Sequence, residues 1–360
     1  MNKAFGPALF LLLLGFVLRA QDTLTVVFAG DIMGHDRLIT SAKTADGYDF
    51  SPNYRYIAPY LRRADFVVGN LEVTLPGRPP YKGYPRFRSP DAMAGDLRDA
   101  GFDLLLTANN HSNDGGLAGV THTLDVLDRE GLYHTGTFRD PPEREALYPL
   151  ILWKNDFKLI FLNATYGTNG ITTPAPTVVN LIDTAQLRTD LTFARRFEPD
   201  FTFMVMHWGK EYQFREAKGQ RHLAQQLLHW GADAVVGAHP HVVQPVRYEY
   251  SRGDSTRTRG LVAYSLGNFV SDQTSLDPDG GALLEMTLVR ENGATRVLQF
   301  RSIPIYCHVQ NPKSKRPGFF VLPPEALNDE DLLQKLKFTD ADRMKFRTFI
   351  KRTTNQLMGG

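Results

Sequence analysis

The stretch ADAVVGAHPH at residues 232–241 decides the fold that we expect. Its first seven residues form an apolar run typical of a buried strand, and His239 and His241 follow directly. Four more such runs stand just before potential metal ligands: TLTVVFA (23–29) before Asp31, ADFVVG (64–69) before Glu72, FDLLLTA (102–108) before Asn110 and His111, and FTFMVM (201–206) before His207. Because the carboxyl ends of strands in an open α/β sheet meet along one edge, we expect these side chains to surround one metal site.

Length and composition indicate a folded protein with one large domain or two. The chain has 360 residues, of which 42% are hydrophobic, and a net charge of +2. Basic residues form no stripe, so the sequence does not indicate nucleic-acid binding. Cys307 is the single cysteine, which excludes an internal disulfide and a multi-cysteine zinc site. Any metal must therefore be held by histidine, asparagine and carboxylate side chains.

Residues 1–20 have the pattern of a secretory signal peptide. Lys3 provides the positive start, an apolar segment runs from Phe5 to Leu18, and Ala20 is a small residue at the expected cleavage point. The alternative is an uncleaved anchor, although the apolar segment is shorter than the ~20 residues that a membrane helix needs. We expect an exported protein of the periplasm or cell envelope, with membrane attachment only through an uncleaved signal.

From residue 22 to about 285, strand-like and helix-like segments alternate, which predicts βαβ units. The expected helices cover 53–64, 89–100, 117–131 and 216–231, with Ser89 and Pro90 as the N-cap and first residue of the second. The segment after Gly280 predicts a β-hairpin that turns at Asn292-Gly293. We therefore expect a main domain over 22–310 and a C-terminal helical extension over 311–360, with a polar helix near 329–351.

The side chains at the strand ends have alternative interpretations when each is taken alone. Asp31 and Asp114 could be helix caps, and Glu72 could be an exposed loop residue. Neutral imidazole is the commonest protein ligand for metals, and sets of nitrogen and oxygen ligands suit Zn, Mn or Fe(II). His111 could instead act as a general acid, with Asp114 three residues later orienting its ring. Because the pattern recurs at five strand ends, we favour a metal site.

Six blocks of the sequence resemble one known family: GDIM (30–33), GNLE (69–72), ANNHSNDGG (108–116), MHWGKEY (206–212), GADAVVGAHPHVVQPV (231–246) and YSLGNF (264–269). In this order they resemble the CapA family of poly-γ-glutamate capsule synthesis proteins, within the calcineurin-like metallophosphoesterase superfamily. The resemblance spans residues 24–285. It implies a metallo-dependent phosphatase-like fold, a four-layer α/β/β/α sandwich with mixed sheets, and residues 22–310 as a CapA-like metallophosphatase domain.

The resemblance also implies a centre of two divalent metal ions, Mn, Fe or Zn. Its motifs carry over to this chain as a set of ligands and one acid: Asp31 and His241 on one ion, Asn110, His207 and His239 on the other, Glu72 as the bridge and His111 as the proton donor to the leaving group.

Two departures from the superfamily pattern affect this assignment. The first motif is usually Asp-x-His, but Met33 stands at the second ligand position, with His35 as an alternative ligand two residues later. The bridging acid is usually aspartate, and Glu72 is longer. A centre with only one ion is therefore the alternative.

Three functions are compatible with the sequence. The first is a metal-dependent hydrolase acting on a phosphoester or a γ-glutamyl polymer, with Arg86 and Arg88 binding the anionic substrate unless they belong to a solvated loop. The second is a non-catalytic envelope protein that binds an anionic polymer or a partner in the capsule synthase machinery. The third is a serine hydrolase using Ser265, although the residues after AYSLG (263–267) do not favour the helix that a nucleophile elbow requires.

Overall fold

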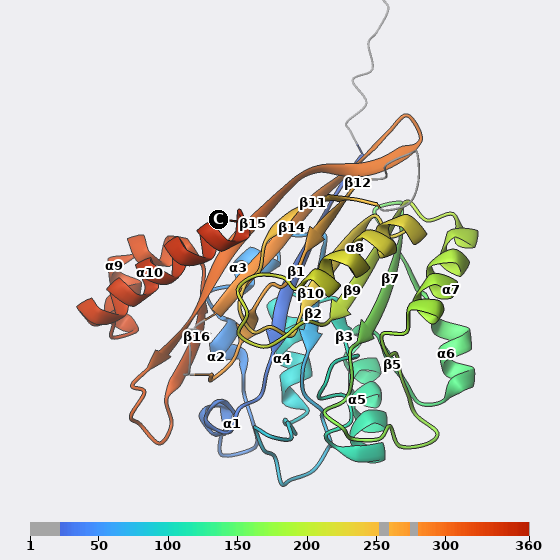
Figure 1. The fold of residues 1–360 in the computed structure, drawn as a ribbon. Coiled ribbons are helices and arrows are strands. Elements are labelled where there is room, and N and C mark those ends of the chain that lie inside the picture. The colour runs from blue at the N-terminus through green and yellow to red at the C-terminus, as the bar shows by residue number, and fades with distance from the viewer. Residues whose placement is uncertain (1–21, 252–258, 274–279, 360) are drawn as a thin grey trace, which may run out of the picture.

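The computed structural model describes residues 22–251, 259–273 and 280–359. The predicted signal at 1–20 lies outside these ranges. Two large β-sheets lie face to face, with helices on their outer surfaces (Figure 1). No helix within the described ranges has the length and apolar character needed to span a bilayer.

The first sheet has eight strands in the order β16-β15-β14-β1-β2-β3-β4, with β13 paired to β1. Its strands are β1 (Asp22–Ile32), β2 (Phe66–Leu71), β3 (Leu104–Leu106), β4 (Tyr133–Thr135), β13 (Asn268–Val270), β14 (Gly280–Glu291), β15 (Ala294–Gln310) and β16 (Gly318–Leu322). Strands β1 to β4 are parallel, whereas β14, β15 and β16 run antiparallel to their neighbours. The predicted hairpin with its turn at Asn292-Gly293 is confirmed.

The second sheet has six strands in the order β11-β12-β10-β9-β7-β6. Its strands are β6 (Leu150–Lys154), β7 (Phe157–Thr165), β9 (Phe201–His207), β10 (Ala234–Ala238), β11 (Val246–Tyr250) and β12 (Arg259–Ala263). The four central strands are parallel, and β6 and β11 are antiparallel edges. A separate two-stranded ribbon joins β5 (Thr137–Phe138) to β8 (Val178–Val179). Both large sheets are therefore mixed, as predicted.

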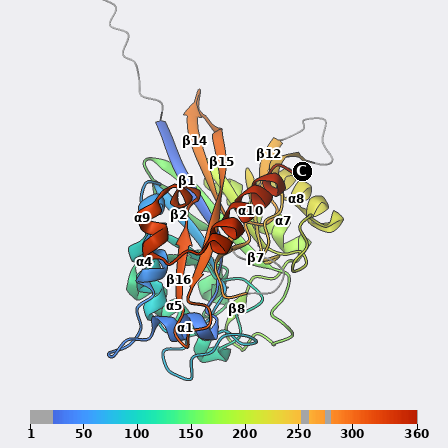
Figure 2. The same cartoon turned by 90° about the vertical axis from the view of Figure 1, so that its left-hand side faces the viewer.

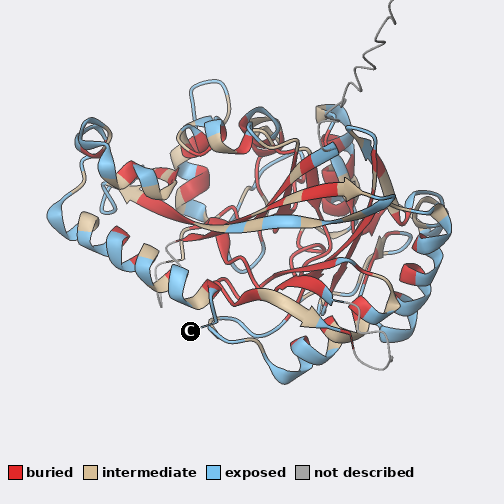
Figure 3. Ribbon diagram, turned by 90° about the horizontal axis from the view of Figure 1, so that it is seen from above, coloured by how far each residue is buried: buried red, intermediate tan, exposed pale blue. Residues whose placement is uncertain are grey.

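Side-chain alternation along the strands explains the layering. In β1, Val26 and Phe28 face the second sheet, where they join the same core as Phe161 and Phe203. Val27, on the opposite face, packs with the outer helices. Figure 3 shows the result, with buried residues concentrated in the strands and exposed ones on the outer faces of the helices.

Helices complete the four layers. Those that pack on the first sheet are α1 (Asp36–Ala42), α2 (Ser51–Tyr54), α3 (Ala58–Leu61), α4 (Ala92–Ala100) and α5 (Gly116–Glu130). Those on the side of the second sheet are α6 (Pro141–Leu147), α7 (Thr184–Ala194), the 3₁₀ turn η1 (Arg195–Phe197) and α8 (Lys218–Trp230). The expected α/β/β/α sandwich is confirmed.

Some predicted helices differ in their details. The helix expected over 53–64 is two short helices, α2 and α3, because Pro59 in its interior has no backbone N–H and fits only the first turn of a new helix. Ser89 is not an N-cap: its backbone N–H donates to Thr74, and α4 begins at Ala92 after Asp91.

The C-terminal segment is more than a helical extension. It begins with β16, which pairs with β15 at the edge of the first sheet, and continues through η2 (Pro324–Asn328), α9 (Glu330–Lys335) and α10 (Asp340–Leu357). Phe346 and Phe349 of α10 pack against Tyr306 of β15, so this helix lies across the long hairpin strands (Figure 2).

Candidate metal centre

The structure brings together the six predicted metal ligands and the predicted acid His111, which lie at or just after the ends of strands in both sheets. His207 Nε2 lies 2.7 Å from Asn110 Oδ1, and the rings of His207 and His239 are 4.8 Å apart between centroids. On the other side of the site, His241 Nδ1 lies 3.1 Å from Asp31 Oδ2. These side chains are buried, so the site lies within the sandwich edge and not on an open surface.

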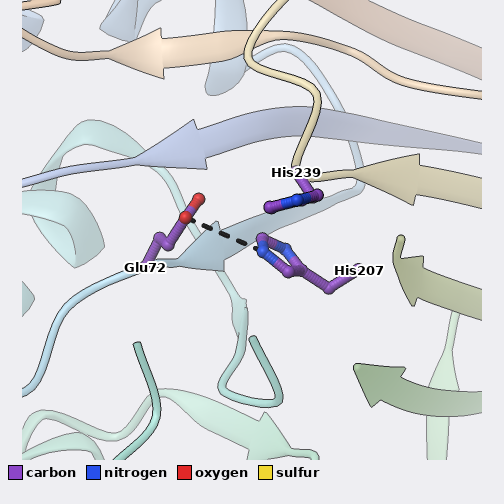
Figure 4. Close-up of side chains that lie close together, drawn as sticks. All are labelled: Glu72, His207 and His239. Carbon is purple, nitrogen blue, oxygen red and sulfur yellow. Dashed lines mark ion pairs between the residues drawn. The ribbon is translucent and has the colours of Figure 1, made fainter. Parts of the chain in front are cut away.

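Glu72 lies at the centre of the site. Its Oε1 atom is 3.7 Å from His207 Nε2, 3.8 Å from His241 Nε2 and 4.0 Å from His111 Nε2. Figure 4 shows its carboxylate facing the rings of His207 and His239. The side chain is completely buried, yet neither carboxylate oxygen has a hydrogen-bond partner. A buried polar group normally has one, because leaving it unpaired is costly.

The potential ligands form two groups that share Glu72. Glu72, His207 and His239 are one group, and Asp31, Glu72 and His241 are the other; within each, the ligand atoms lie within 4.8 Å of one another. His239 Nδ1 is also buried without a partner. Unpaired nitrogen and oxygen donors at this spacing fit a divalent cation, so the residues present are suited to metal binding.

Unusual backbone geometry positions the two histidines of the His-Pro-His loop. His239 has φ of 98° and His241 has φ of 56°, a left-handed region that residues other than glycine seldom adopt. The backbone N–H of His239 donates to Asp31 Oδ2 over 3.2 Å, which ties the loop to the end of β1. Close packing leaves no room for a side chain at Gly237, where a Cβ would lie 1.9 Å from the Tyr264 carbonyl oxygen.

Burial sets the protonation of the site. It lowers the pKa of His207 well below the usual value, and neighbouring His239 adds to this effect. Burial, with His241 nearby, also lowers the pKa of His239 to about 3. Burial raises the pKa of Glu72, and the charge of Asp31 raises it further. The imidazoles of His207 and His239 are therefore neutral, the form that binds metals, and a nearby cation would favour the carboxylate form of Glu72.

His111 is held differently from the other histidines. Its Nδ1 atom lies 2.6 Å from Asp114 Oδ2, which also accepts a hydrogen bond from the backbone N–H of Phe87. The Phe87 ring packs edge-on against the imidazole at 4.6 Å. Its Nε2 atom thus remains directed toward Glu72 and the site. Asp114 is not a helix cap, because α5 begins after Gly115.

Four other predicted residues lie outside the ligand groups. His35 is partly buried, and its Nδ1 atom accepts a hydrogen bond from the backbone N–H of Asp272, which leaves only Nε2 for a metal. Arg86 is exposed and Arg88 half-buried, and neither guanidinium has a hydrogen bond or ion pair with any described residue. Of their segment, Phe87 is the residue that contacts His111. Ser265 is buried and leads into β13 instead of a helix, which contradicts the nucleophile-elbow interpretation.

Comparison with known proteins identifies the family of this chain. The family model described as bacterial capsule synthesis protein PGA_cap matches residues 25–273. The chain belongs to the PGA_cap family.

Two curated relatives agree with the PGA_cap assignment, and one solved structure shares the fold. The capsule biosynthesis protein CapA of Bacillus anthracis is 28% identical over 305 residues, covering 82% of this chain and 70% of the relative. The PGA biosynthesis protein CapA of Bacillus subtilis (strain 168) is 28% identical over 308 residues, covering 81% and 74%. The NAD nucleotidase NadN of Haemophilus influenzae superposes with a TM-score of 0.50 at 12% identity, over 92% of this chain but only 60% of that enzyme, and this likeness concerns the fold alone.

The structure adds residues to this PGA_cap site that strand-end reasoning missed. Asn70 Nδ2 donates to Asp31 Oδ1 over 2.7 Å and lies 3.2 Å from His207 Nδ1, so it joins the two halves of the site. Asn268 Oδ1 lies 3.0 Å from His241 Nδ1. Both stand inside the blocks GNLE and YSLGNF, so the family motifs already contained the signal. The carboxylate of Glu211 lies beside His239 and His241 as a third potential ligand group.

Proposed function

We propose that this protein is an exported, metal-dependent hydrolase of capsule biosynthesis that holds two divalent ions, Mn, Fe or Zn, and cleaves a phosphoester or γ-glutamyl bond. The PGA_cap family and the CapA relatives support the capsule role. The pattern of residues 1–20 supports export to the periplasm or cell envelope.

The unpaired, fully buried carboxylate of Glu72 is the observation that carries the proposal. It faces three imidazole Nε2 atoms at 3.7–4.0 Å without a hydrogen bond. A structural carboxylate in such a place would be expected to have an arginine, a lysine or a backbone N–H as its partner. Because Glu72 belongs to both ligand groups, it would be the ligand that two bound ions share. His207, Asn110 and His239 would hold one ion, and Asp31 and His241 the other.

When bound, divalent cations polarise a substrate oxygen and make water more acidic. The protein's own contribution to bond cleavage is at His111. Asp114 accepts a hydrogen bond from the Nδ1–H group and stabilises the protonated ring. The Nε2–H group then points into the site, where it can protonate the oxygen or nitrogen that leaves.

Two arginines next to the site suit the binding of an anionic polymer. The guanidinium groups of Arg86 and Arg88 have no partners among the described residues and flank Phe87, which contacts the proposed acid His111. Free guanidinium groups bind phosphate or carboxylate groups through paired hydrogen bonds. We further propose that the capsule synthase machinery is the partner of this protein, on the basis of the family alone.

A metal-loading assay tests the proposal. The protein is purified without chelators, loaded with Mn²⁺ or Zn²⁺, and assayed on phosphodiester and γ-glutamyl substrates beside His239→Asn, His111→Gln and the control His229→Asn, which changes an exposed histidine of α8. We expect EDTA and His239→Asn to abolish turnover, and His111→Gln to lower it by about 10²–10⁴-fold while metal content stays normal.

Turnover that survives both EDTA and His239→Asn would contradict the proposal that the hydrolase depends on a metal. Absence of turnover, combined with polymer binding that survives His111→Gln, would instead favour the non-catalytic envelope protein.

A further inference from the structure

Glu211 is an exposed carboxylate at the mouth of the metal centre. It follows β9 in the block MHWGKEY. One of its carboxylate oxygens lies within 4.8 Å of ring nitrogens of His239 and His241, which are themselves within that distance of each other. Glu211 thus forms a third ligand group that overlaps the two groups around Glu72 without including Glu72 itself.

Backbone hydrogen bonds fix the Glu211 loop onto the His-Pro-His loop. The N–H of Trp208 donates to the Ala238 carbonyl over 3.1 Å, and the N–H of Tyr212 donates to the Pro240 carbonyl over 2.8 Å. The chain makes this approach with a positive φ of 61° at Tyr212. Such conformations persist only where the surroundings enforce them, so the close approach of the Glu211 loop to the His-Pro-His loop is built into the fold.

The carboxylate of Glu211 has no hydrogen bond or ion pair with any part of the chain that the structure describes. Nearby Glu216, in contrast, binds both Arg221 and Arg247. The Nδ1 atom of His239, facing the same site, is buried and equally without a partner. Glu211 and His239 belong to loops that are held together by backbone hydrogen bonds, so both side chains are available to the same site.

The first motif lacks one of the donors that the superfamily pattern provides. Met33 occupies that position, and its side chain is 1% exposed within the core beneath the outer helices. Its side chain therefore belongs to the apolar core packed beneath these helices. His35 has one ring nitrogen engaged by the backbone of Asp272. His35 can therefore offer a cation beside His241 only its Nε2 atom, which leaves room for a further ligand from another segment of the chain.

We propose that Glu211 is a metal ligand that supplies a further carboxylate oxygen to the ion assigned to Asp31 and His241, from a position beside His239. The inference rests on the proposed metal centre and assigns it one more ligand. Carboxylate and imidazole ligands suit Mn²⁺, Fe²⁺ or Zn²⁺. Together with Asp31 and Glu72, a third carboxylate leaves two divalent ions with a small net positive charge, which still attracts an anionic substrate.

Metal binding in solution tests this assignment directly. Wild-type protein, Glu211→Gln and the control Glu145→Gln, an exposed glutamate of α6, are stripped with EDTA and dialysed against a series of Mn²⁺ concentrations. Bound metal is then counted by mass spectrometry, and electron paramagnetic resonance reports whether two Mn²⁺ ions are coupled. We expect Glu211→Gln to bind the weaker ion at least about tenfold less tightly, since even indirect partners of a metal contribute 10–100-fold, and to lose the coupled signal at limiting Mn²⁺.

The outcomes separate this inference from the proposed function. If Glu211→Gln binds both ions as wild type does, while His239→Asn loses them, the ligand role of Glu211 is wrong and the metal centre stands. If the wild-type protein binds no divalent ion, the metal centre fails and the role of Glu211 fails with it. Equal urea-unfolding midpoints for the EDTA-treated wild type and Glu211→Gln exclude misfolding as the cause of weaker binding.

Discussion

Replacement of Glu72 by methionine separates the cost of this buried carboxylate to folding from its value to metal binding. Both carboxylate oxygens are buried without a hydrogen bond. An unsatisfied buried polar group costs about 1–3 kcal/mol, and methionine has a similar length without a strongly polar atom. In the presence of EDTA we therefore expect Glu72→Met to raise the free energy of unfolding by about 1–3 kcal/mol.

Divalent ions should reverse this order. A ligand that binds only the folded protein stabilises it by about 2.7 kcal/mol at a concentration 100 times its Kd. Because Glu72 belongs to two ligand groups, the variant loses most of that gain. Urea unfolding followed by circular dichroism, with EDTA and with Mn²⁺, measures both effects. Manganese should raise the midpoint of the wild type and leave that of Glu72→Met almost unchanged.

Asp190 provides the matched control for this experiment. It is also a buried carboxylate, but Arg144 Nη2 lies 2.7 Å from one oxygen and Gln186 Nε2 lies 2.8 Å from the other. Asp190→Asn should destabilise the protein equally with EDTA and with Mn²⁺, because it removes a paired charge far from the metal ligands. If Glu72→Met also destabilises the protein equally with EDTA and with Mn²⁺, the reasoning that the unpaired Glu72 binds a cation is refuted.

Three further predictions concern proton donation, packing and pH. Asp114→Asn should lower kcat by about 10–100-fold with unchanged metal content, because the ring of His111 loses its charged partner. The loss should be greatest for substrates with poor leaving groups, and equal losses for all leaving groups would contradict this role of Asp114. Gly237→Ala should destabilise the fold by about 1–3 kcal/mol or more in urea unfolding, because the added Cβ would lie 1.9 Å from the Tyr264 carbonyl oxygen. An unchanged unfolding midpoint would contradict that packing. Burial lowers the pKa of His308, so the stability that its neutral ring contributes is complete above pH ~6.5 and falls as the pH drops below that value. His308→Gln should therefore lose less stability than the wild type between pH 7 and 5. An identical loss would show that His308 does not contribute to the pH dependence of stability.

The sequence was sufficient to predict the five strands that lead to the candidate ligands and the edge where the candidate metal centre lies. Apolar runs that end in polar residues reflect a local requirement, namely that the strand interior is buried and its end is not. The alternation of Val26, Val27 and Phe28 likewise follows from the two-residue period of a strand. These features depend on neighbours in the sequence, which explains why they could be found without coordinates.

The remaining features depend on contacts between distant segments. Strand β16 pairs with β15 across a loop, although its own residues lie between basic and proline-rich stretches. Asn70 matters because it lies between Asp31 and His207, which are far from each other in the sequence. The position of Glu211 results from two loops held together by backbone hydrogen bonds. No local pattern contains this information.

The same loops link the fold to the chemistry of the site. Asp31 accepts a hydrogen bond from the backbone of His239 and lies beside the ring of His241, so it stabilises the strained loop and also offers an oxygen to a cation. The positive φ angles of both histidines cost about 1–3 kcal/mol each, and a conformation of that cost persists only when the surrounding contacts enforce it. A cation bound to Asp31 and His241 would add to those contacts. Metal binding and the ordering of the His-Pro-His loop should therefore be coupled, and hydrogen exchange at the backbone N–H of His239 should slow when Mn²⁺ is added.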